Sequence, residues 1–216
     1  MRRSAVMSIT KTVEKYVQEH PSVKDCLKKG LVNYSALARQ IAEELGLDAE
    51  RNFDALLIAA RRSHEKVAKE KDSQEKILSV LRQSRVEIKN RMVAFVLERG
   101  VPPKSLTDLE NKAKKAGEVL HIIEGVSAMT LITVEELSKE IRSLFRNFII
   151  RENKELVEVI LKSPKEIEQT AGIMGYLCSL LGENGVNIVE EMSCWTDTIF
   201  LVQEKDLGKV MELLKF

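Results

Sequence analysis

The feature that most constrains this chain is an order of apolar segments that occurs twice between residue 85 and the C-terminus. In the first occurrence, strand-like and helical patterns follow in the order strand, helix, strand, strand, helix, strand. These segments lie at 92–97, 105–116, 119–123, 129–133, 133–144 and 148–150. This is the order of the split βαβ, or ferredoxin-like, fold, in which helices cover one face of an antiparallel sheet.

The second occurrence has the same order but no sixth segment. It contains a strand at 156–161, a helix from Ser163, strands at 187–194 and 198–202, and a closing helix at 206–214. Phe95 and Val159 lie 64 positions apart, and Thr133 and Gln203 lie 70 apart, so the two occurrences form an internal repeat. The last strand of the second occurrence can come either from residues 85–90 or from a partner chain.

Capping residues predict where the helices begin. The clearest start is Ser163-Pro164-Lys165-Glu166, which places a cap, a proline at the first helical position and a glutamate at the third. The other helices are expected to begin at Thr10, Ser22, Ser35, Phe53, Ser73, Ser105 and Thr133, with residues 48–52 as a polar turn.

These patterns predict an α+β protein with an N-terminal helical domain that resembles a helix-turn-helix, followed by two ferredoxin-like modules. The expected boundaries are 1–72 for the helical domain, 73–84 for a connecting helix, 85–152 for the first module and 153–216 for the second. A chain of 216 residues is long for one domain and sufficient for two or three small ones.

Two turns in the second module resemble those of ACT domains, most closely the regulatory ACT repeat of aspartate kinases. The first is Thr170-Ala171-Gly172-Ile173, in which Ala171 stands where the family has proline. The second is Asn184-Gly185-Val186-Asn187-Ile188. The resemblance covers about the last 60 residues and is weaker over 85–153. The whole chain is similar to archaeal-type ACT proteins that carry an N-terminal helical domain.

The resemblance implies a small-molecule effector, such as an amino acid, bound at the seam between paired ACT modules. Glycine at position 172 lets a ligand approach the backbone, and free amides at a helix start suit a carboxylate. Asn187 can donate and accept hydrogen bonds, as a zwitterion requires. The alternative is that Gly172 serves only the turn and Asn187 only the strand start. The expected ligand-binding residues are Gly172, Ile173, Met174, Gly175, Asn187 and Ile188.

The segment from Ser35 to Gly46 and the helix from Phe53 resemble a helix-turn-helix, with the later helix as the recognition helix. Residues 1–72 hold 14 Lys and Arg against 11 Asp and Glu, a net charge of +3. The expected DNA-binding residues are Ser35, Arg39, Arg51, Asn52, Arg61, Arg62 and His64. The alternative is a helical domain for dimerisation or for docking to a partner.

Catalytic and metal-binding patterns are absent from the sequence. His20, His64 and His121 are isolated in the sequence, and His121 lies in an apolar strand as a partly buried, structural residue. The three cysteines form no CxxC pair, and the chain has no GxGxxG, GxxxxGK[ST] or GxSxG. We therefore expect no enzyme, cofactor or metal.

The cysteine usage fits a reducing compartment, and no apolar segment approaches the roughly 18 residues of a membrane span. The expected protein is cytoplasmic, does not bind membranes and forms a homodimer, because open sheet edges need covering. Two regulatory functions fit these expectations. One is a ligand-responsive transcription regulator, and the other is a regulatory subunit that docks on a biosynthetic enzyme. A third alternative is an enzyme whose active site has none of these motifs.

Overall fold

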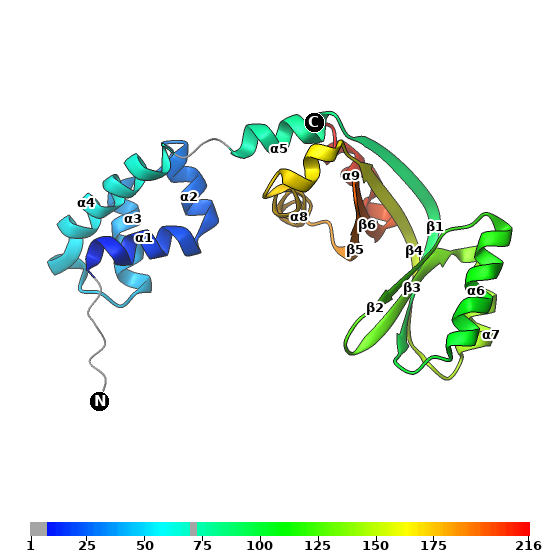
Figure 1. Cartoon of the computed structure of the whole chain (residues 1–216). Coiled ribbons are helices and arrows are strands. Elements are labelled where there is room, and N and C mark those ends of the chain that lie inside the picture. Colours follow the sequence, from blue (N-terminus) through cyan, green and yellow to red (C-terminus); the bar gives the residue numbers. More distant parts are fainter. Residues whose placement is uncertain (1–7, 70–72) are drawn as a thin grey trace. The chain divides into compact units, whose positions relative to one another are not determined.

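The computed structural model describes residues 8–69 and 73–216, and the chain divides into two compact units, 1–72 and 73–216 (Figure 1). The first unit is helical, and the second combines helices with a curled antiparallel sheet. The expected mixed α+β class is therefore confirmed. Among the described residues, no helix combines the length and the apolar character that crossing a membrane requires.

The described part of the first unit contains α1 (Ile9–Glu19), α2 (Pro21–Lys28), α3 (Tyr34–Glu44) and α4 (Ala49–Val67). Each helix turns an apolar stripe inward, and fully buried side chains from all four form one core, including Val13, Leu27, Ile41 and Leu56. The core places α3 and α4 against each other across a short turn at residues 45–48.

The start of α4 differs from the prediction. Asp48 was expected in a polar turn before a helix from Phe53, but its carboxylate accepts a hydrogen bond from the Arg51 amide at 3.0 Å and caps a helix that begins at Ala49. Arg51 and Asn52 therefore lie in the first turn of α4. Similarly, α1 begins at Ile9 after the Ser8 cap, and α2 begins at Pro21.

The second unit begins with α5 (Ser73–Arg82) and contains a six-stranded sheet in the order β2-β3-β1-β4-β6-β5. All neighbouring strands are antiparallel. The strands are β1 (Arg85–Glu98), β2 (Leu120–Glu124), β3 (Ala128–Val134), β4 (Ile149–Lys162), β5 (Ile188–Cys194) and β6 (Asp197–Gln203).

The two central strands are 14 residues long, and each belongs to both halves of the sheet. Residues 92–98 of β1 pair with β3, while residues 85–89 pair with the end of β4. The sequence predicted two strands where β4 is continuous. Arg91 and Glu155, which lie 64 positions apart, have φ of 58° and 55°, and the register between β1 and β4 shifts after Lys89. Such bulges bend each long strand in its middle.

Helices cover one face of the sheet, and alternation along the strands separates the two faces. The first half carries α6 (Pro103–Ala116) and α7 (Ser138–Phe145), which pack on Phe95 and Leu131. The second half carries α5, α8 (Ile173–Glu183) and α9 (Leu207–Leu213), which pack on Val159 and Phe200. The opposite, inner face buries Met92, Ile132, Leu156 and Leu201.

Three predicted helix starts in this unit are wrong. α6 begins at Pro103 instead of Ser105. Thr133 lies in β3, where its hydroxyl donates to the Val119 carbonyl at 2.5 Å, and α7 follows the 3-10 turn η1 (Glu135–Leu137). After Pro164 the chain forms only the 3-10 helix η2 (Lys165–Gln169). The last 3-10 turn, η3 (Glu204–Asp206), precedes α9.

Candidate functional site

The segment 163–172, here called the α8 turn, joins the end of β4 to the start of α8. Its first residue, Ser163, donates its amide to the Thr196 carbonyl at 3.0 Å and accepts a hydrogen bond from the Ser84 hydroxyl at 2.9 Å. Within the turn, the Thr170 hydroxyl donates to the Glu166 carbonyl at 2.7 Å. These bonds hold the turn against the β5–β6 hairpin and against the end of α5.

Gly172 ends the α8 turn and occupies the N-cap position of α8 with φ of 95°. This left-handed conformation strongly favours glycine, and it separates α8 from the 3-10 helix η2, which ends at Gln169. A Cβ at this position would lie 3.2 Å from Cδ1 of Ile77 on α5. The first amides of a helix have no partner within the helix, so the start of α8 can receive an anionic group.

The three residues that follow Gly172 would offer a ligand their backbone groups more than their side chains. Ile173 is buried, and Met174 is half-buried with its sulfur 3.9 Å from the Thr198 hydroxyl that donates to it. Gly175 is exposed. Of the predicted ligand residues, these three and Gly172 therefore lie together at one end of α8, and a ligand there would meet mainly peptide groups.

Asn187 and Ile188 lie at the other end of α8. Asn187 is exposed and precedes β5, directly after the helix end at Asn184 to Val186. Since α8 has 11 residues, its two ends are about 16 Å apart at 1.5 Å per residue. One amino acid cannot span that distance, so the structure does not bring Gly172 and Asn187 of one module into a single site.

The predicted DNA-binding residues also lie in two groups, one on α4 and the other on α3. Arg51 and Asn52 lie in the first turn of α4, and Arg62, which is exposed, lies about three turns later on the same side. Arg61 places its guanidinium 6.0 Å from the ring centre of Tyr34, and the hydroxyl of the same tyrosine is hydrogen-bonded to His64.

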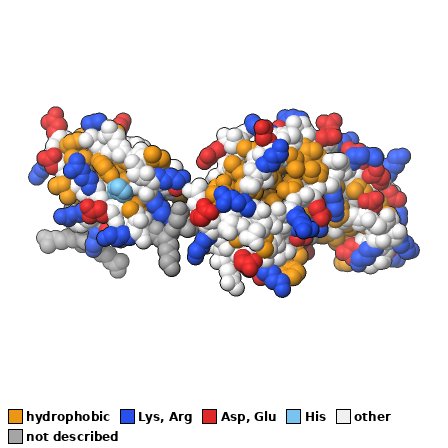
Figure 2. All heavy atoms as spheres, turned by 90° about the horizontal axis from the view of Figure 1, so that it is seen from above, with side chains coloured by type: hydrophobic (Ala, Val, Ile, Leu, Met, Phe, Trp, Pro, Cys, Tyr) orange, Lys and Arg blue, Asp and Glu red, His pale blue; other side chains and the backbone are white. Residues whose placement is uncertain are grey.

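The two candidates on α3 lie beside this region. Ser35 is in the first turn, and its amide donates to the Asn33 side chain at 3.0 Å. Arg39 is exposed and lies 6.0 Å from the ring centre of Phe53. In the view of Figure 2, the Lys and Arg side chains of this unit are interspersed with Asp and Glu. The basic side chains of α3 and α4 are therefore separated from one another by acidic ones.

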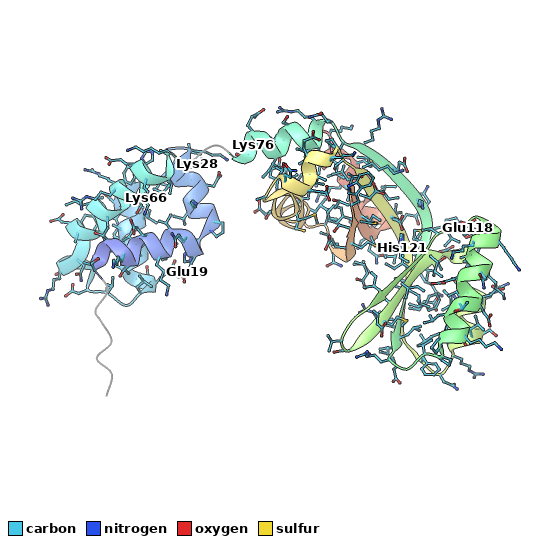
Figure 3. All side chains as sticks on the ribbon, viewed as in Figure 1. Glu19, Lys28, Lys66, Lys76, Glu118 and His121 are labelled. Carbon is cyan, nitrogen blue, oxygen red and sulfur yellow. The ribbon has the colours of Figure 1, made fainter. Side chains whose placement is uncertain are left out.

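The sequence did not predict a polar set on the inner face of the sheet. Glu158 on β4 is fully buried, and its Oε2 lies 2.9 Å from Nε2 of His121 on β2. Its Oε1 has no hydrogen bond among the described residues and lies 3.8 Å from Nζ of Lys89. His121 (labelled in Figure 3) is partly buried, as expected, and its pairing with Glu158 was not predicted. The sequence signal was a single acid within the apolar run 156–161.

A second polar contact lies near this set, where the Thr130 hydroxyl donates to Glu190 Oε1 at 3.2 Å and joins β3 to β5. The other two histidines also have neighbours: His20 stacks on Tyr16, and His64 bonds to Tyr34. Over residues 8–69 and 73–216, no three His, Cys, Asp or Glu side chains are grouped so that they could hold a metal ion.

The second unit also has a cavity of about 250 Å³ between α7 and the two long strands. In its lining, Arg142 donates two hydrogen bonds to Glu152, at 2.6 and 3.2 Å, and this pairing holds the pKa of the Glu152 carboxyl below its ordinary value. The cavity is lined by Val93, Glu135, Ser138, Lys139, Arg142, Glu152 and Lys154. None of the predicted ligand residues contributes to it.

Neither the known family models nor the curated proteins contain a match to this chain. Solved structures that resemble it include the aspartate kinase of Clostridium acetobutylicum, described as an allosteric enzyme, with 16% identity and a TM-score of 0.49. That likeness covers 60% of this chain and 33% of the kinase, so the matched region spans about a third of the enzyme.

Two further structures are similar over the same share of the chain. The ligand-free regulatory subunit of aspartate kinase from Thermus thermophilus has 11% identity and a TM-score of 0.47, over 60% of this chain and 92% of that subunit. E. coli aspartokinase III in complex with lysine and aspartate has 13% identity and a TM-score of 0.45, over 61% of this chain and 32% of the enzyme. These three structures are an aspartate kinase, a regulatory subunit of such a kinase and an aspartokinase.

Proposed function

We propose that residues 85–216 form two ACT modules and that the chain is a regulatory protein, without catalytic activity of its own, that responds to an amino acid. The observation that carries this proposal is the internal symmetry of the sheet. The half formed by β2, β3, β1 and β4 has the ferredoxin-like strand order, and β5, β6, β4 and β1 repeat it in the other half.

The two long strands support this division into modules. Residues 149–153 of β4 complete the first module, and residues 85–89 of β1 take the same place in the second, where the sequence left the last strand open. The bulges at Arg91 and Glu155 fall at equivalent positions, 64 residues apart, at the junction of the modules. A repeated fold with exchanged end strands accounts for both features.

The second module is the better candidate for ligand binding. Its helix α8 begins with Ile173, Met174 and Gly175, whose amides are available in the first turn. The equivalent helix of the first module, α6, begins at Pro103 after Pro102, and neither residue has an amide hydrogen to donate. A carboxylate therefore has more donors at Gly172 than at the corresponding turn of the first module.

The distance along α8 favours a site shared between two chains. Gly172 and Asn187 lie about 16 Å apart within one module, so both can contact one amino acid only if they come from different modules. We therefore propose a homodimer in which the α8 turn of one copy and Asn187 of the other bind the same ligand. The carboxylate would meet the α8 amides, and Asn187 would contact the ammonium group.

A thermal-shift screen of the twenty amino acids tests this function. A ligand at 100 times its dissociation constant should raise the free energy of unfolding by about 2.7 kcal/mol, or the melting temperature by roughly 5–10 °C. We expect one amino acid, or a chemically related few, to produce the shift and Asn187→Ala to abolish it. Equal shifts in both proteins would show that the ligand binds elsewhere.

For the first unit, we propose DNA binding through α4, with docking to a biosynthetic enzyme as the alternative. Recognition helices contact bases with their N-terminal residues, and the observed start of α4 places Arg51 and Asn52 there. Arg62 lies on the same side and can contact phosphate. In favour of docking, Leu31 and Ile58 are 73% and 50% exposed, as apolar side chains at protein interfaces often are.

Duplex binding at several salt concentrations separates these two roles. The double variant Arg51→Ala with Arg62→Ala should bind more weakly, and the slope of log K against log salt should become shallower by about 1, because Arg62 is the proposed phosphate contact. Lys114→Ala with Lys115→Ala on α6 is the charge-matched control, because both lysines are exposed and lie in the second unit. Equal binding by the two double variants would remove α4 as the DNA contact and favour docking.

A further inference from the structure

Helix α5 contacts both ends of the α8 turn. At the end of the turn, Ile77 Cδ1 lies 3.2 Å from where a Cβ on Gly172 would be. At its start, the hydroxyl of Ser84, two residues after α5, donates to the Ser163 hydroxyl at 2.9 Å. The helix therefore lies along the α8 turn and is fixed to it at two points.

The contact at Gly172 is specific. Six glycines of the described chain have positive φ, and Gly172 is the one among them whose Cβ position has a neighbouring atom within 4 Å. The space above this glycine is therefore filled by Ile77. Any change in the backbone at the start of α8 must displace that side chain or be prevented by it.

The order of α5 depends on this packing. A helix of 10 residues is marginal by itself, since isolated helices below about 12–15 residues are barely stable in water. The buried face of α5 consists of Ile77, Val80 and Leu81, which pack in the core beneath α8 and α9. Its other face is exposed at Glu75, Lys76 and Arg82 (Figure 3).

We propose that α5 is a strap whose order depends on the state of the α8 turn, a proposal that rests on the function proposed above. An anion bound by the α8 amides would fix the turn and, through Ile77, the helix.

Hydrogen–deuterium exchange of the full chain without ligand tests the contact. Gly172→Ala pushes a methyl group against Ile77, so the α5 amides from Ile77 to Arg82 should exchange about tenfold faster. Gly185→Ala is the matched control, since this glycine has φ of 73° at the other end of α8 and no atom within 4 Å of its Cβ position. Exchange in α5, normalised to β4, should be unchanged in the control.

Equal acceleration of α5 by the two glycine variants would overturn the proposal, because backbone strain would then explain both. A second test places Gly172→Ala in the Ile77→Ala background, where it should add no further change in α5. An added change of the original size would show that Ile77 does not carry the coupling, and it would also overturn the proposal.

The same exchange experiment in the presence of a mixture of the twenty amino acids distinguishes a failure of the strap from a failure of the proposed function. If one binds, α5 should exchange more slowly in the wild type and not in Ile77→Ala. Slower exchange in both proteins would contradict the strap. If none binds, the proposed function fails, while the comparison of Gly172→Ala with Gly185→Ala still decides whether α5 is coupled to the turn.

Discussion

Replacing His121 with alanine should lower the free energy of unfolding of residues 73–216 by about 3 kcal/mol, because the fully buried Glu158 side chain loses its hydrogen-bond partner. Glu158 is fully buried, and His121 lies 2.9 Å from its Oε2. Lys89 lies 3.8 Å from the other oxygen and is 43% exposed, so it compensates only in part. Urea denaturation measures the loss.

The matched control removes both polar partners. His121→Leu combined with Glu158→Leu should recover most of the lost stability, since replacing a buried pair by apolar residues of similar volume is often neutral or stabilising. The inner face that surrounds the pair is already apolar, with Ile132, Leu156 and Leu201. A double variant as unstable as His121→Ala would show that the pair contributes shape or hydrogen bonding that leucine cannot replace.

The second large effect is expected at Phe200, whose side chain is fully buried beneath α8 and α9. Phe200→Ala should cost about 3–5 kcal/mol through lost burial and the cavity that remains. Because β1 and β4 run through both halves of the sheet, hydrogen exchange should accelerate in β2 and β3 as well as in β6. Chemical denaturation followed by exchange measures both quantities.

Phe148→Ala is the control for this prediction, since Phe148 is only half-buried at the edge of the first core. Its loss of stability should be clearly smaller. Accelerated exchange in Phe200→Ala that stays within β5 and β6 would show that the two halves of the sheet open separately. The proposed modules would then be independent in stability, although they share two strands.

The order of elements could be predicted from the sequence because the apolar periodicity is strong in each segment. The continuity of β4 could not, because Asn153, Lys154 and Glu155 form a polar stretch that resembles a loop. Glu155 adopts φ of 55° within the strand, a conformation that costs energy in a non-glycine residue and is sustained only by the surrounding sheet. Local sequence does not contain that support.

Helix starts were the least predictable feature, since several residues nearby can cap. Ser163 and Pro164 do precede a helical turn, but it ends at Gln169 and α8 begins only at Ile173. Asp48 has the capping chemistry expected of a helix start, and the prediction placed it in a loop instead. That error moved Arg51 and Asn52 out of the first turn of α4.

For the candidate site, the turn could be predicted from the sequence but the spacing of its residues could not. The turn before α8 was found from its glycine and its resemblance to ACT domains, and the structure shows a left-handed glycine there. The separation of Gly172 from Asn187 follows from the length of α8, which lies between them. The sequence did not give that length, because the start of α8 was predicted wrongly. The pairing of His121 with Glu158, 37 positions apart, depends on the curl of the sheet and has no local sequence signal.

Equilibrium dialysis of the purified full chain against a mixture of the twenty amino acids tests the central claim most directly. Amino-acid analysis of both compartments identifies any ligand that is retained and gives its stoichiometry. We expect one amino acid, or a related few, to be retained by the wild type and released by Asn187→Ala. Retention of none of the twenty would contradict an amino-acid-responsive role and would leave the second unit as a scaffold for association.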